Sequence, residues 1–517
     1  MTSSLYGIYN AQRSLLLNQA AINLINNNIA NINTPGYSKQ RLELSQNINA
    51  NPNANIPLIA SQSGTGATID AITRNRDIYL DTYLRKETTT LNYYKELNDS
   101  ATLIEDIANE LGDSGISTSL NEFYAAAQQL SLNPTDSIAR NNLIQKALDV
   151  CGKFNITADR ITDLRTNLVG DIADPATLET SKINVSSDYL NVQLAAIADL
   201  NQTISLSTSQ GMTPNGLLDE RDKLLDKIAE YIPITVTHGA NNLVSISING
   251  TDIVKGKDQV GFFDVVVGDV LNPATVRILD ETGAVVVANA NALLTSGKMG
   301  AILEMGGSDP NKLNIYNFVQ NLDSLAREFA REVNTIQRGG QYIDTSVTPQ
   351  VLTPVTVAVP PPDPFDVFVE LAGATQANYG NLTAGNIRIN QDVIDDVYKI
   401  AAARATSAPN ETGDGNNSLL LGQLRDKKIA ALGNTETEAY LNSLVGKLGI
   451  QVKSIQENYD SQNTIVQQVE TRRDSVTGVN MDEELTDLVR FQRAFEASAR
   501  MFNVMDTIMQ QIINLAK

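Results

Sequence analysis

The chain has 517 residues, a net charge of −20 and an isoelectric point of about 4.5. Binding of nucleic acid needs clustered lysine and arginine, so this acidic balance argues against nucleic acid as a main partner. Apolar residues make up 42% of the sequence and charged residues 19%, which argues against a disordered chain, and the length predicts roughly two to four domains.

Few residues are suited to catalysis or metal binding. The one cysteine, Cys151, permits no disulfide within the chain, and we interpret it as a small buried hydrophobic residue. The one histidine, His238, lacks the partners of a catalytic triad or a metal site, so we expect a strand or turn residue there. The stretch "GDGNN" at 413–417 lacks the spaced ligands of a calcium loop and predicts a turn. The sequence therefore predicts no enzyme, no cofactor and no metal site.

No segment indicates a membrane partner. No apolar run approaches the roughly 18 to 20 residues of a membrane-spanning helix. Tyr6, Asn10, Gln12 and Arg13 interrupt the apolar character of the N-terminus, so we expect no cleavable secretory signal. Both ends of the chain are amphipathic, but they carry few of the basic residues that membrane-surface helices place on their polar face. We expect these ends to pack on protein.

The first predicted element is one long helix that ends near residue 31. Steps of three and four residues define one face of it, with polar residues at alternate positions: Leu5, Ile8, Gln12, Leu15, Gln19, Ile22, Asn26 and Ile29. Thr34 precedes Pro35, and proline disfavours helical backbone in the residue before it. Gly36 then permits a tight turn. Asn31 and Asn33 are expected to bond free carbonyl groups or to tolerate left-handed backbone where the helix ends.

Helical periodicity recurs along the next part of the chain. The segments that show it are residues 88–111, a stretch beginning at Asp136, a stretch from Asp174 toward Ser207, "LLDERDKLLDKIAEYI" and "LDSLAREFAREVNTI". The acidic "LLDERD" could suggest a pair of catalytic carboxylates. We interpret it instead as a solvated helix face, because Leu217, Leu218, Leu224 and Leu225 supply an inward face.

Two stretches have the character of β-structure. In the first, "ITVTHGANNLVSISING" predicts a strand, a turn and a second strand with Val244, Ile246 and Ile248 on one face. "GFFDVVVG", "TVRIL" and "AVVVANANALL" continue in the same style, which predicts a compact β unit over 233–296. In the second, "PVTVAVPPPDPFDVFVEL" predicts two strands joined across a proline-rich turn within an insertion over 341–400, although a long surface loop is an alternative.

Two long helices are predicted at the C-terminal end. The first keeps strict four-three spacing over about five heptads, a strong coiled-coil or long-bundle signal: Leu441, Val445, Leu448, Val452, Ile455, Tyr459, Gln462, Val466, Val469, Arg473 and Val476. Asn480 and Glu483 then form a capping-box-like start for the second helix. This helix has two neighbouring apolar rows, Phe491, Ala494, Ser498, Met501, Met505, Ile508, Ile512 and Leu515, and Leu485, Leu488, Phe495, Phe502, Met509 and Ile513.

The sequence thus predicts an α+β multidomain protein with a nested topology. The chain leaves through a series of domains and returns through them, so the N- and C-terminal helices pair as a coiled-coil-like inner domain. The expected units are a terminal helical domain, a long-helix bundle in the middle, a β-rich outer domain and a small β-rich insertion. Their ranges are, in that order, 1–40 with 478–517; 41–232 with 297–340 and 401–477; 233–296; and 341–400.

The two ends also resemble a known family. The run Ala30-Asn31-Ile32-Asn33-Thr34-Pro35-Gly36-Tyr37 is similar to the N-terminal signature of bacterial flagellar axial proteins, the rod, hook and hook-associated family. "GVNMDEELTDLVRFQRAFEASARMFNVMDTIMQQIINL" resembles the C-terminal signature of the same family. Tyr37-Ser38, the "NGLLDERDKLLDKIAEYIPITV" block and "ETGDGNNSLLLGQLRD" resemble the members at the hook–filament junction. Residues 250–296 and 341–400 carry no recognisable motif.

This resemblance implies a structural role in the flagellum. Such proteins are exported without a cleaved signal peptide through the flagellar type III apparatus, with an export chaperone as a further expected partner. They assemble outside the cell as a helical ring of copies between the hook protein and a second junction protein, and they adapt the hook to the filament. Their terminal helices form an inner tube. The residues expected to make its subunit contacts are Leu5, Ile8, Leu15, Ile22, Ile29, Leu485, Leu488, Phe491, Phe495, Met501, Phe502, Met505, Ile508 and Ile512.

Three alternatives remain at this point. A hook or distal rod protein of the same family would form a longer tube. An enzyme carried on the flagellum would need a catalytic or metal-binding cluster, which the sequence does not offer. A surface-binding module would use the β-rich regions as adhesive loops, and binding of a glycan or host protein by the isolated 233–296 unit would support it.

Overall fold

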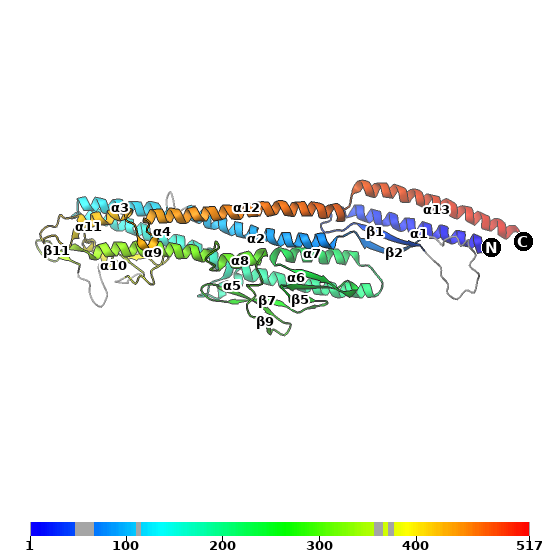
Figure 1. Cartoon of the computed structure of the whole chain (residues 1–517), viewed down its shortest axis with the longest axis horizontal. Coiled ribbons are helices and arrows are strands. Elements are labelled where there is room, and N and C mark those ends of the chain that lie inside the picture. Colours follow the sequence, from blue (N-terminus) through cyan, green and yellow to red (C-terminus); the bar gives the residue numbers. More distant parts are fainter. Residues whose placement is uncertain (1, 47–66, 110–114, 356–365, 371–376, 516–517) are drawn as a thin grey trace.

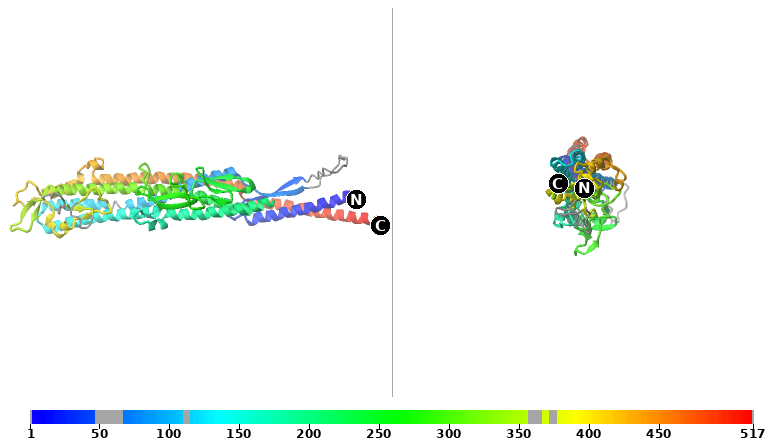
Figure 2. Two further views of the ribbon diagram at one scale, coloured as in Figure 1. Left: turned by 90° about the horizontal axis from the view of Figure 1, so that it is seen from below. Right: turned by 90° about the vertical axis from the view of Figure 1, so that its left-hand side faces the viewer.

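The protein is a long rod in which both chain ends lie together at one tip. The computed structural model describes residues 2–46, 67–109, 115–355, 366–370 and 377–515. Figures 1 and 2 show the blue N-terminal and red C-terminal helices side by side at this tip, with the remaining helices continuing the rod away from them. The small β-sheets lie in the middle of the chain, so the predicted mixed α+β class is confirmed.

Two successive helix pairs make up the length of the rod. At the tip, α1 (Thr2–Ala30) packs along α13 (Met481–Leu515). Further along, α2 (Ile78–Asn109) packs along α12 (Thr437–Thr477). Between α1 and α2 the chain forms an antiparallel hairpin of β1 (Gln40–Gln46) and β2 (Ala67–Arg74). The predicted pairing of the terminal helices is confirmed, and the hairpin was not anticipated.

The buried stripe of α1 is made of small and amide side chains as well as large apolar ones. It consists of Ala11, Asn18, Ala21, Leu24, Ile25 and Asn28. Ile8, Leu15, Ile22 and Ile29 lie beside this stripe and are half-buried. Gln12, Gln19 and Asn26, which we expected at polar seam positions, are instead exposed. Alanines let the two helices approach closely. The polar position in the contact between them is occupied by Asn18, whose side-chain amide donates to the Ser498 hydroxyl at 3.3 Å.

The α2–α12 pair follows the predicted heptads. Every residue of the predicted α12 seam is buried or half-buried along the 41-residue helix. At the end of this pair that adjoins the terminal helices, Leu84 of α2 packs against Val466 and Val469. The amide nitrogen of Gln462, a polar seam position, donates to the backbone carbonyl of Glu87 at 3.1 Å and to its carboxylate. The four-three spacing therefore predicted the packing face of this helix.

The far end of the rod is a helical bundle with short strands. The helices here are α3 (Ile116–Leu132), α4 (Ser137–Val169), α9 (Ile315–Arg338), α10 (Gln391–Asp395) and α11 (Asn416–Gln423). The strands are β10 (Gly340–Asp344), β11 (Val351–Pro354) and β14 (Ala403–Arg404) in one sheet, and β12 (Phe368–Val369) with β13 (Arg388–Ile389) in another. Phe123, Tyr124, Phe329 and Phe368 form its aromatic core.

Two predictions for this end can be compared with the structure. The two strands expected across the proline-rich turn are not partners as far as the structure describes them, because β11 pairs with β10 and β12 pairs with β13. Residues 356–365, which include most of that turn, lie outside the described residues. The "GDGNN" stretch is a turn only at its start, since Asn416 and Asn417 begin α11; Asp414 accepts hydrogen bonds from the backbone nitrogens of Arg404 and Asn416, at 2.8 and 3.0 Å.

A β-rich unit lies against the middle of the rod, below it in Figure 1. The helices that flank this unit in the sequence are α5 (Ala176–Thr180), α6 (Lys182–Ser209), α7 (Asn215–Tyr231) and α8 (Gly297–Gly306). One sheet has the order β3 (Thr235–His238), β4 (Val244–Ile248), β5 (Thr251–Lys255) and β6 (Asp258–Gln259). The other has β7 (Phe262–Val267), β8 (Ala274–Leu279) and β9 (Val285–Val287).

The packing predictions for this part of the chain are confirmed. Val244, Ile246 and Ile248 are fully buried on one face of β4. His238 is the last residue of β3.

Cys151 is buried in α4, and burial raises the pKa of its thiol to about 12, so it is an inert core residue. None of the helices in the described part of the chain combines the length and apolar character that crossing a membrane requires.

Candidate functional site at the joint between the helix pairs

The motif that follows α1 forms a tight turn. The side-chain amide of Asn31 donates to the Asn27 carbonyl at 2.9 Å where the helix ends, although this carbonyl is not free, since it also accepts the Asn31 backbone nitrogen at 3.1 Å. The backbone nitrogen of Tyr37 donates to the Thr34 carbonyl at 3.1 Å, and Gly36 between them has a φ of +85°. This is the geometry of a type II turn, with Pro35 at its second position. The left-handed backbone thus falls to Gly36, whereas Asn33 is simply exposed.

Asn28 ties this turn to both terminal helices. It is 1% exposed, and its amide nitrogen donates to the Gln40 carbonyl at 3.0 Å and to the Glu484 carboxylate at 3.1 Å. Its amide oxygen accepts from the Tyr37 hydroxyl at 2.8 Å and from the Gln40 nitrogen at 3.1 Å. These four bonds use all of the hydrogen-bonding capacity of the amide. Burial, with the charges of Asp219 and Glu484, raises the pKa of Tyr37 to about 12, so the phenol stays a donor.

Lys39 links the same turn to the start of α13 and the end of α12. Its ammonium lies 2.9 Å from Glu483 and 3.0 Å from Glu484, and its backbone nitrogen donates to the Thr477 carbonyl at 2.8 Å. Partial burial would lower the pKa of Lys39, but the hydrogen bonds that its ammonium donates to the two carboxylates raise it. Asn480 caps α13 as predicted, by accepting from the Asp482 nitrogen at 2.9 Å. The Glu483 carboxylate bonds Lys39, outside the capping box in which we expected it.

Behind the turn, Arg74 at the end of β2 and Arg76 just before α2 meet aspartates of α7. Arg74 lies 2.8 Å from both Asp219 and Asp222. Arg76 lies 2.8 Å from Asp81 and 3.0 Å from Asp222. These side chains are between 7 and 14% exposed, so the pairs are only weakly screened by solvent. The arrangement fixes the start of α2 against α7.

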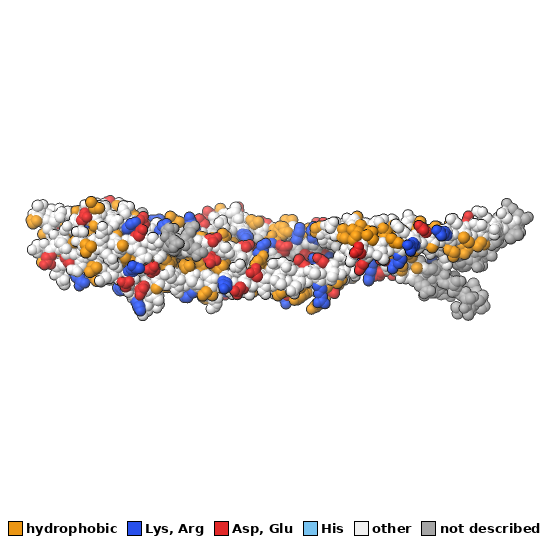
Figure 3. All heavy atoms as spheres, turned by 90° about the horizontal axis from the view of Figure 1, so that it is seen from above, with side chains coloured by type: hydrophobic (Ala, Val, Ile, Leu, Met, Phe, Trp, Pro, Cys, Tyr) orange, Lys and Arg blue, Asp and Glu red, His pale blue; other side chains and the backbone are white. Residues whose placement is uncertain are grey.

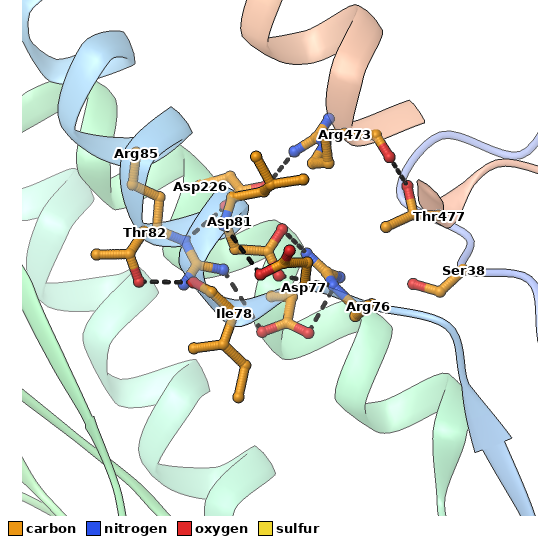
Figure 4. Close-up of polar contacts among 12 residues, drawn as sticks. Ser38, Arg76, Asp77, Ile78, Asp81, Thr82, Arg85, Asp226, Arg473 and Thr477 are labelled. Carbon is orange, nitrogen blue, oxygen red and sulfur yellow. Dashed lines mark hydrogen bonds and ion pairs between the residues drawn. The ribbon is translucent and has the colours of Figure 1, made fainter. Parts of the chain in front are cut away.

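The same network reaches the turn and α12 (Figure 4). Arg85 lies 2.7 Å from Asp226, and Arg473 at the end of α12 lies 3.2 Å from the same carboxylate. The Ser38 hydroxyl, from the turn itself, donates to Asp219 at 2.7 Å. We call this set of contacts around residues 28–39, 74–85, 219–226 and 473–484 the joint. It holds together four segments that are far apart in sequence.

The ionic network keeps Asp222 charged. Burial alone would raise the pKa of Asp222, but Arg76, Arg74 and Arg85 outweigh it and lower the pKa. Burial lowers the pKa of nearby Arg221 to about 10, yet this guanidinium remains protonated at neutral pH. Within the described ranges, no group of three or more histidine, cysteine, aspartate or glutamate side chains could hold a metal ion. The joint is suited to mechanical attachment.

The sequence did not reveal this network. We interpreted "LLDERD" as a solvated face, but Asp219 and Asp222 are 8% and 7% exposed and paired with arginine, so that interpretation was wrong. Leu218 and Leu225 are buried as expected. The available signal was the spacing of Asp219, Asp222 and Asp226, which places three carboxylates along one side of a helix. Their arginine partners lie more than a hundred residues away, so the sequence could not pair them.

The predicted inner-tube residues of α13 divide between two faces. Leu488, Phe491, Phe495, Phe502 and Met505 are half-buried. Leu485, Met501 and Ile508 are exposed, together with Met481, Val489 and Val504. Figure 3 shows apolar side chains along the terminal helices on the upper side of the molecule. The side chains of Leu5 and Ile512 lie outside the described set. The helix pair therefore leaves two groups of exposed apolar side chains on α13 that α1 does not cover, one at 481–489 and one at 501–508.

Comparisons with known proteins agree with this architecture. The family described as flagellar hook-associated protein FlgK helical domain matches residues 101–349, and the family described as flagellar basal body rod FlgEFG protein C-terminal matches residues 472–515. The chain is 29% identical to flagellar hook-associated protein 1 of Bacillus subtilis and 24% identical to that of Escherichia coli. These alignments cover 99% and 98% of this chain, and 99% of each relative. The chain is thus similar over almost its whole length to flagellar hook-associated protein 1.

A solved structure shares the fold. The flagellar hook junction protein FlgK from Burkholderia pseudomallei aligns with a TM-score of 0.57 and 16% identity, over 77% of this chain and all of that chain. The family is structural and not enzymatic. Full-length similarity to these relatives makes the chain a component of the flagellum.

Proposed function

We propose that this chain is a structural axial protein that forms the junction between the hook and the filament and acts as a mechanical adaptor. The observation that carries this function is the joint, combined with the full-length similarity to hook-associated protein 1. A structural adaptor needs a stiff body and a fixed connection to the part that assembles. The ion pairs of Asp222 and Asp226 supply such a connection at the point where the two helix pairs meet.

The assembling part is the pair of terminal helices, residues 1–40 and 478–517. Leu485, Met501 and Ile508 expose apolar surface, and soluble monomers seldom leave large apolar patches uncovered. Neighbouring copies that cover these side chains would place the helices in an inner tube. Because copies repeat in one direction, such contacts are heterologous and propagate around a helical ring. The outer β-rich unit, 233–296, and the insertion, 341–400, then face outward.

The further partners follow from this position. The hook protein and a second junction protein would contact the ring from its two sides, outside the cell. An export chaperone and the flagellar type III apparatus would handle the chain before assembly. The part of α13 with these exposed side chains is a suitable segment for a chaperone, because it needs cover until a neighbouring copy arrives.

Imaging of the hook–filament boundary tests the role directly. Cells that lack the protein should retain hooks and lose filaments, and the full chain supplied in trans should restore them. Cells that keep normal filaments would refute the junction role. Deletion of residues 1–35 or 481–517 should leave a folded rod that cannot assemble, and a truncated chain that still forms normal junctions would refute the inner-tube assignment.

A hook or distal rod protein remains the second candidate within the family. It would form a tube many subunits long, whereas a junction protein forms a thin layer. Counting the copies along the axis in isolated hooks separates the two functions.

A further inference from the structure

Helix α6 carries a largely exposed stripe with heptad spacing, in which Tyr189 alone packs on an aromatic ring of the same chain, that of Tyr231 at 4.9 Å between ring centroids. The positions 185, 189, 192, 196, 199, 203 and 206 follow one another in steps of four and three, and they hold Val, Tyr, Val, Ala, Asp, Thr and Leu. Val185, Val192 and Leu206 are 56%, 65% and 53% exposed. Singly exposed apolar residues are ordinary, but three at one heptad position of a single helix form a seam of the kind that packs on another helix.

The rest of α6 is already occupied by its own chain. Ile183, Leu190 and Leu194 are buried, and Asn191 bonds both the backbone nitrogen and the carbonyl of Phe263 in β7, at 2.9 and 2.8 Å. α7 packs along a second side of α6. The heptad stripe is therefore the remaining face of the helix, and its residues Val185, Val192 and Leu206 are exposed to solvent.

A complementary stripe lies at the start of α2. Tyr79 and Tyr83 are 75% and 39% exposed and stack on each other, with ring centroids 6.5 Å apart. Lys86 and Thr90 continue the same four-three spacing. Lys86 is exposed, and among the described residues its ammonium has no ion-pair partner; the Asp199 carboxylate in the α6 stripe is in the same situation. Each stripe thus offers one charge that the other could neutralise.

The two stripes lie at matching heights on the rod. α7 connects them: Arg221 bonds the Asn201 side chain of α6 at 3.0 Å, while Asp226 bonds Arg85 of α2 at 2.7 Å. Asn201 and Arg85 therefore lie at similar positions along the axis of the rod. α7 packs against α6 and against α2, and the start of α6 also contacts α2 directly through the Lys182–Glu96 ion pair. Copies arranged side by side around a tube with parallel rods would bring α6 of one copy level with α2 of the next.

We propose that the α6 stripe of one copy docks on the Tyr79–Thr90 face of α2 in the adjacent copy, with Asp199 beside Lys86. This inference rests on the proposed function, since it requires the chain to assemble with itself. The contact is heterologous, which suits a ring, because each copy presents both stripes and uses each once. It also continues the assembly surface from the terminal helices down the outside of the rod, past the joint.

A charge swap tests the pairing in cells that make the full chain. Asp199→Lys and Lys86→Asp should each reduce the fraction of cells with filaments about tenfold, because each places like charges together. The double variant restores opposite charges across every contact and should recover filaments. Lys453→Asp, at an exposed position of α12, is the matched control and should have no effect. Failure of the double variant to recover filaments while both single variants lose them would overturn the pairing.

Cross-linking shows the contact itself. A chain that carries both Thr203→Cys and Tyr83→Cys, treated with a short bismaleimide in isolated hook–filament preparations, should give a ladder of multimers; the buried native Cys151 should not react. Each single-cysteine chain should stay monomeric. Dimers from Thr203→Cys alone would mean that α6 meets α6, and cross-links to another protein would mean a different occupant; either result overturns the proposal.

The two levels of the argument can fail separately. If the unmodified protein is absent from the hook–filament boundary, the proposed function fails. If it is present and restores filaments, but the double-cysteine chain gives no ladder, only the α6–α2 contact fails. Melting curves of each purified variant that match the unmodified chain exclude misfolding as the cause of a loss.

Discussion

Removing the charge of Asp222 should loosen the joint without changing its shape. Asp222→Asn keeps the size of the side chain, but it deprives three guanidinium groups of a shared carboxylate at 2.8, 3.0 and 3.5 Å. Breaking a buried pair costs about 3 to 5 kcal/mol. Here Arg74, Arg76 and Arg85 each keep a second aspartate, so the lower end, about 3 kcal/mol, is the expected cost.

Hydrogen exchange measures this opening locally. The backbone nitrogen of Lys39 donates to Thr477 and that of Asn75 donates to Lys39, each at 2.8 Å, so both amides are protected only while the joint is closed. A cost of about 3 kcal/mol corresponds to roughly 100-fold faster exchange, since each 1.4 kcal/mol is tenfold. Peptides from the far bundle should exchange as in the unmodified chain.

Asp474→Asn provides the matched control. Its carboxylate is also near an arginine, 3.7 Å from Arg473, but its side chain is 68% exposed. Exposed pairs contribute about 0 to 1 kcal/mol, so exchange at the joint should hardly change. If Asp222→Asn exchanges like this control, the ionic network does not hold the joint closed and the reasoning is wrong.

Three further outcomes are expected. Ile508→Asp places a charge among the exposed apolar side chains of α13 and should abolish filament formation while leaving the melting curve unchanged. The control Asn503→Asp, at an exposed polar position, should change neither filament formation nor the melting curve. A lower melting temperature for Ile508→Asp would contradict the assignment of these side chains to assembly. Gly36→Ala should lower the stability of the joint by about 1 to 2 kcal/mol through its positive φ alone, because the added Cβ meets only Lys223 at an ordinary 3.7 Å. Gly216→Ala, in open space on helix α7, should be stabilising in the same urea titration, and equal effects at the two sites would show that φ is irrelevant. The pKa of Asp222 is lowered in the folded state, so its contribution is present above its ordinary value of 3.8 and is lost as the pH falls through the folded value. Acidification from about pH 5 to below pH 3 should therefore destabilise the unmodified chain more than Asp222→Asn, as followed by calorimetry, and equal losses would exclude the linkage.

Regular heptads predict the buried face of α12 correctly, whereas the mixed composition of α1 leads to a wrong prediction of its buried face. In α12, large β-branched and leucine side chains occupy the seam, so hydrophobic spacing and burial coincide. In α1 the buried positions include Ala11, Ala21 and two asparagines, which hydrophobic spacing alone does not select. Ile8 and Leu15 satisfied the pattern, but they lie beside the stripe. Close helix approach, which favours small residues, decided the orientation.

The joint was only half predictable, because its two halves depend on different ranges of the chain. The turn at Pro35-Gly36 follows from local backbone preferences and was expected. The ion pairs of Asp219 and Asp222 depend on contacts across more than 140 residues, for which one sequence offers no pairing signal. The β1–β2 hairpin escaped notice for the same reason, since residues 47–66 separate strands of mixed polarity such as "QRLELSQ".

The joint also explains how one chain could combine stiffness with a defined orientation. Apolar packing within each helix pair is strong but non-directional, so it does not by itself fix the angle between the pairs. Charged hydrogen bonds are short and directional, and here they converge where the chain crosses between the pairs outward, at 31–39, and back, at 478–480. An adaptor between two stiff assemblies needs its angle set at such a crossing. The alignment of the terminal helices with the rod should therefore depend on the ionic network at the joint far more than on the apolar faces that each pair already buries.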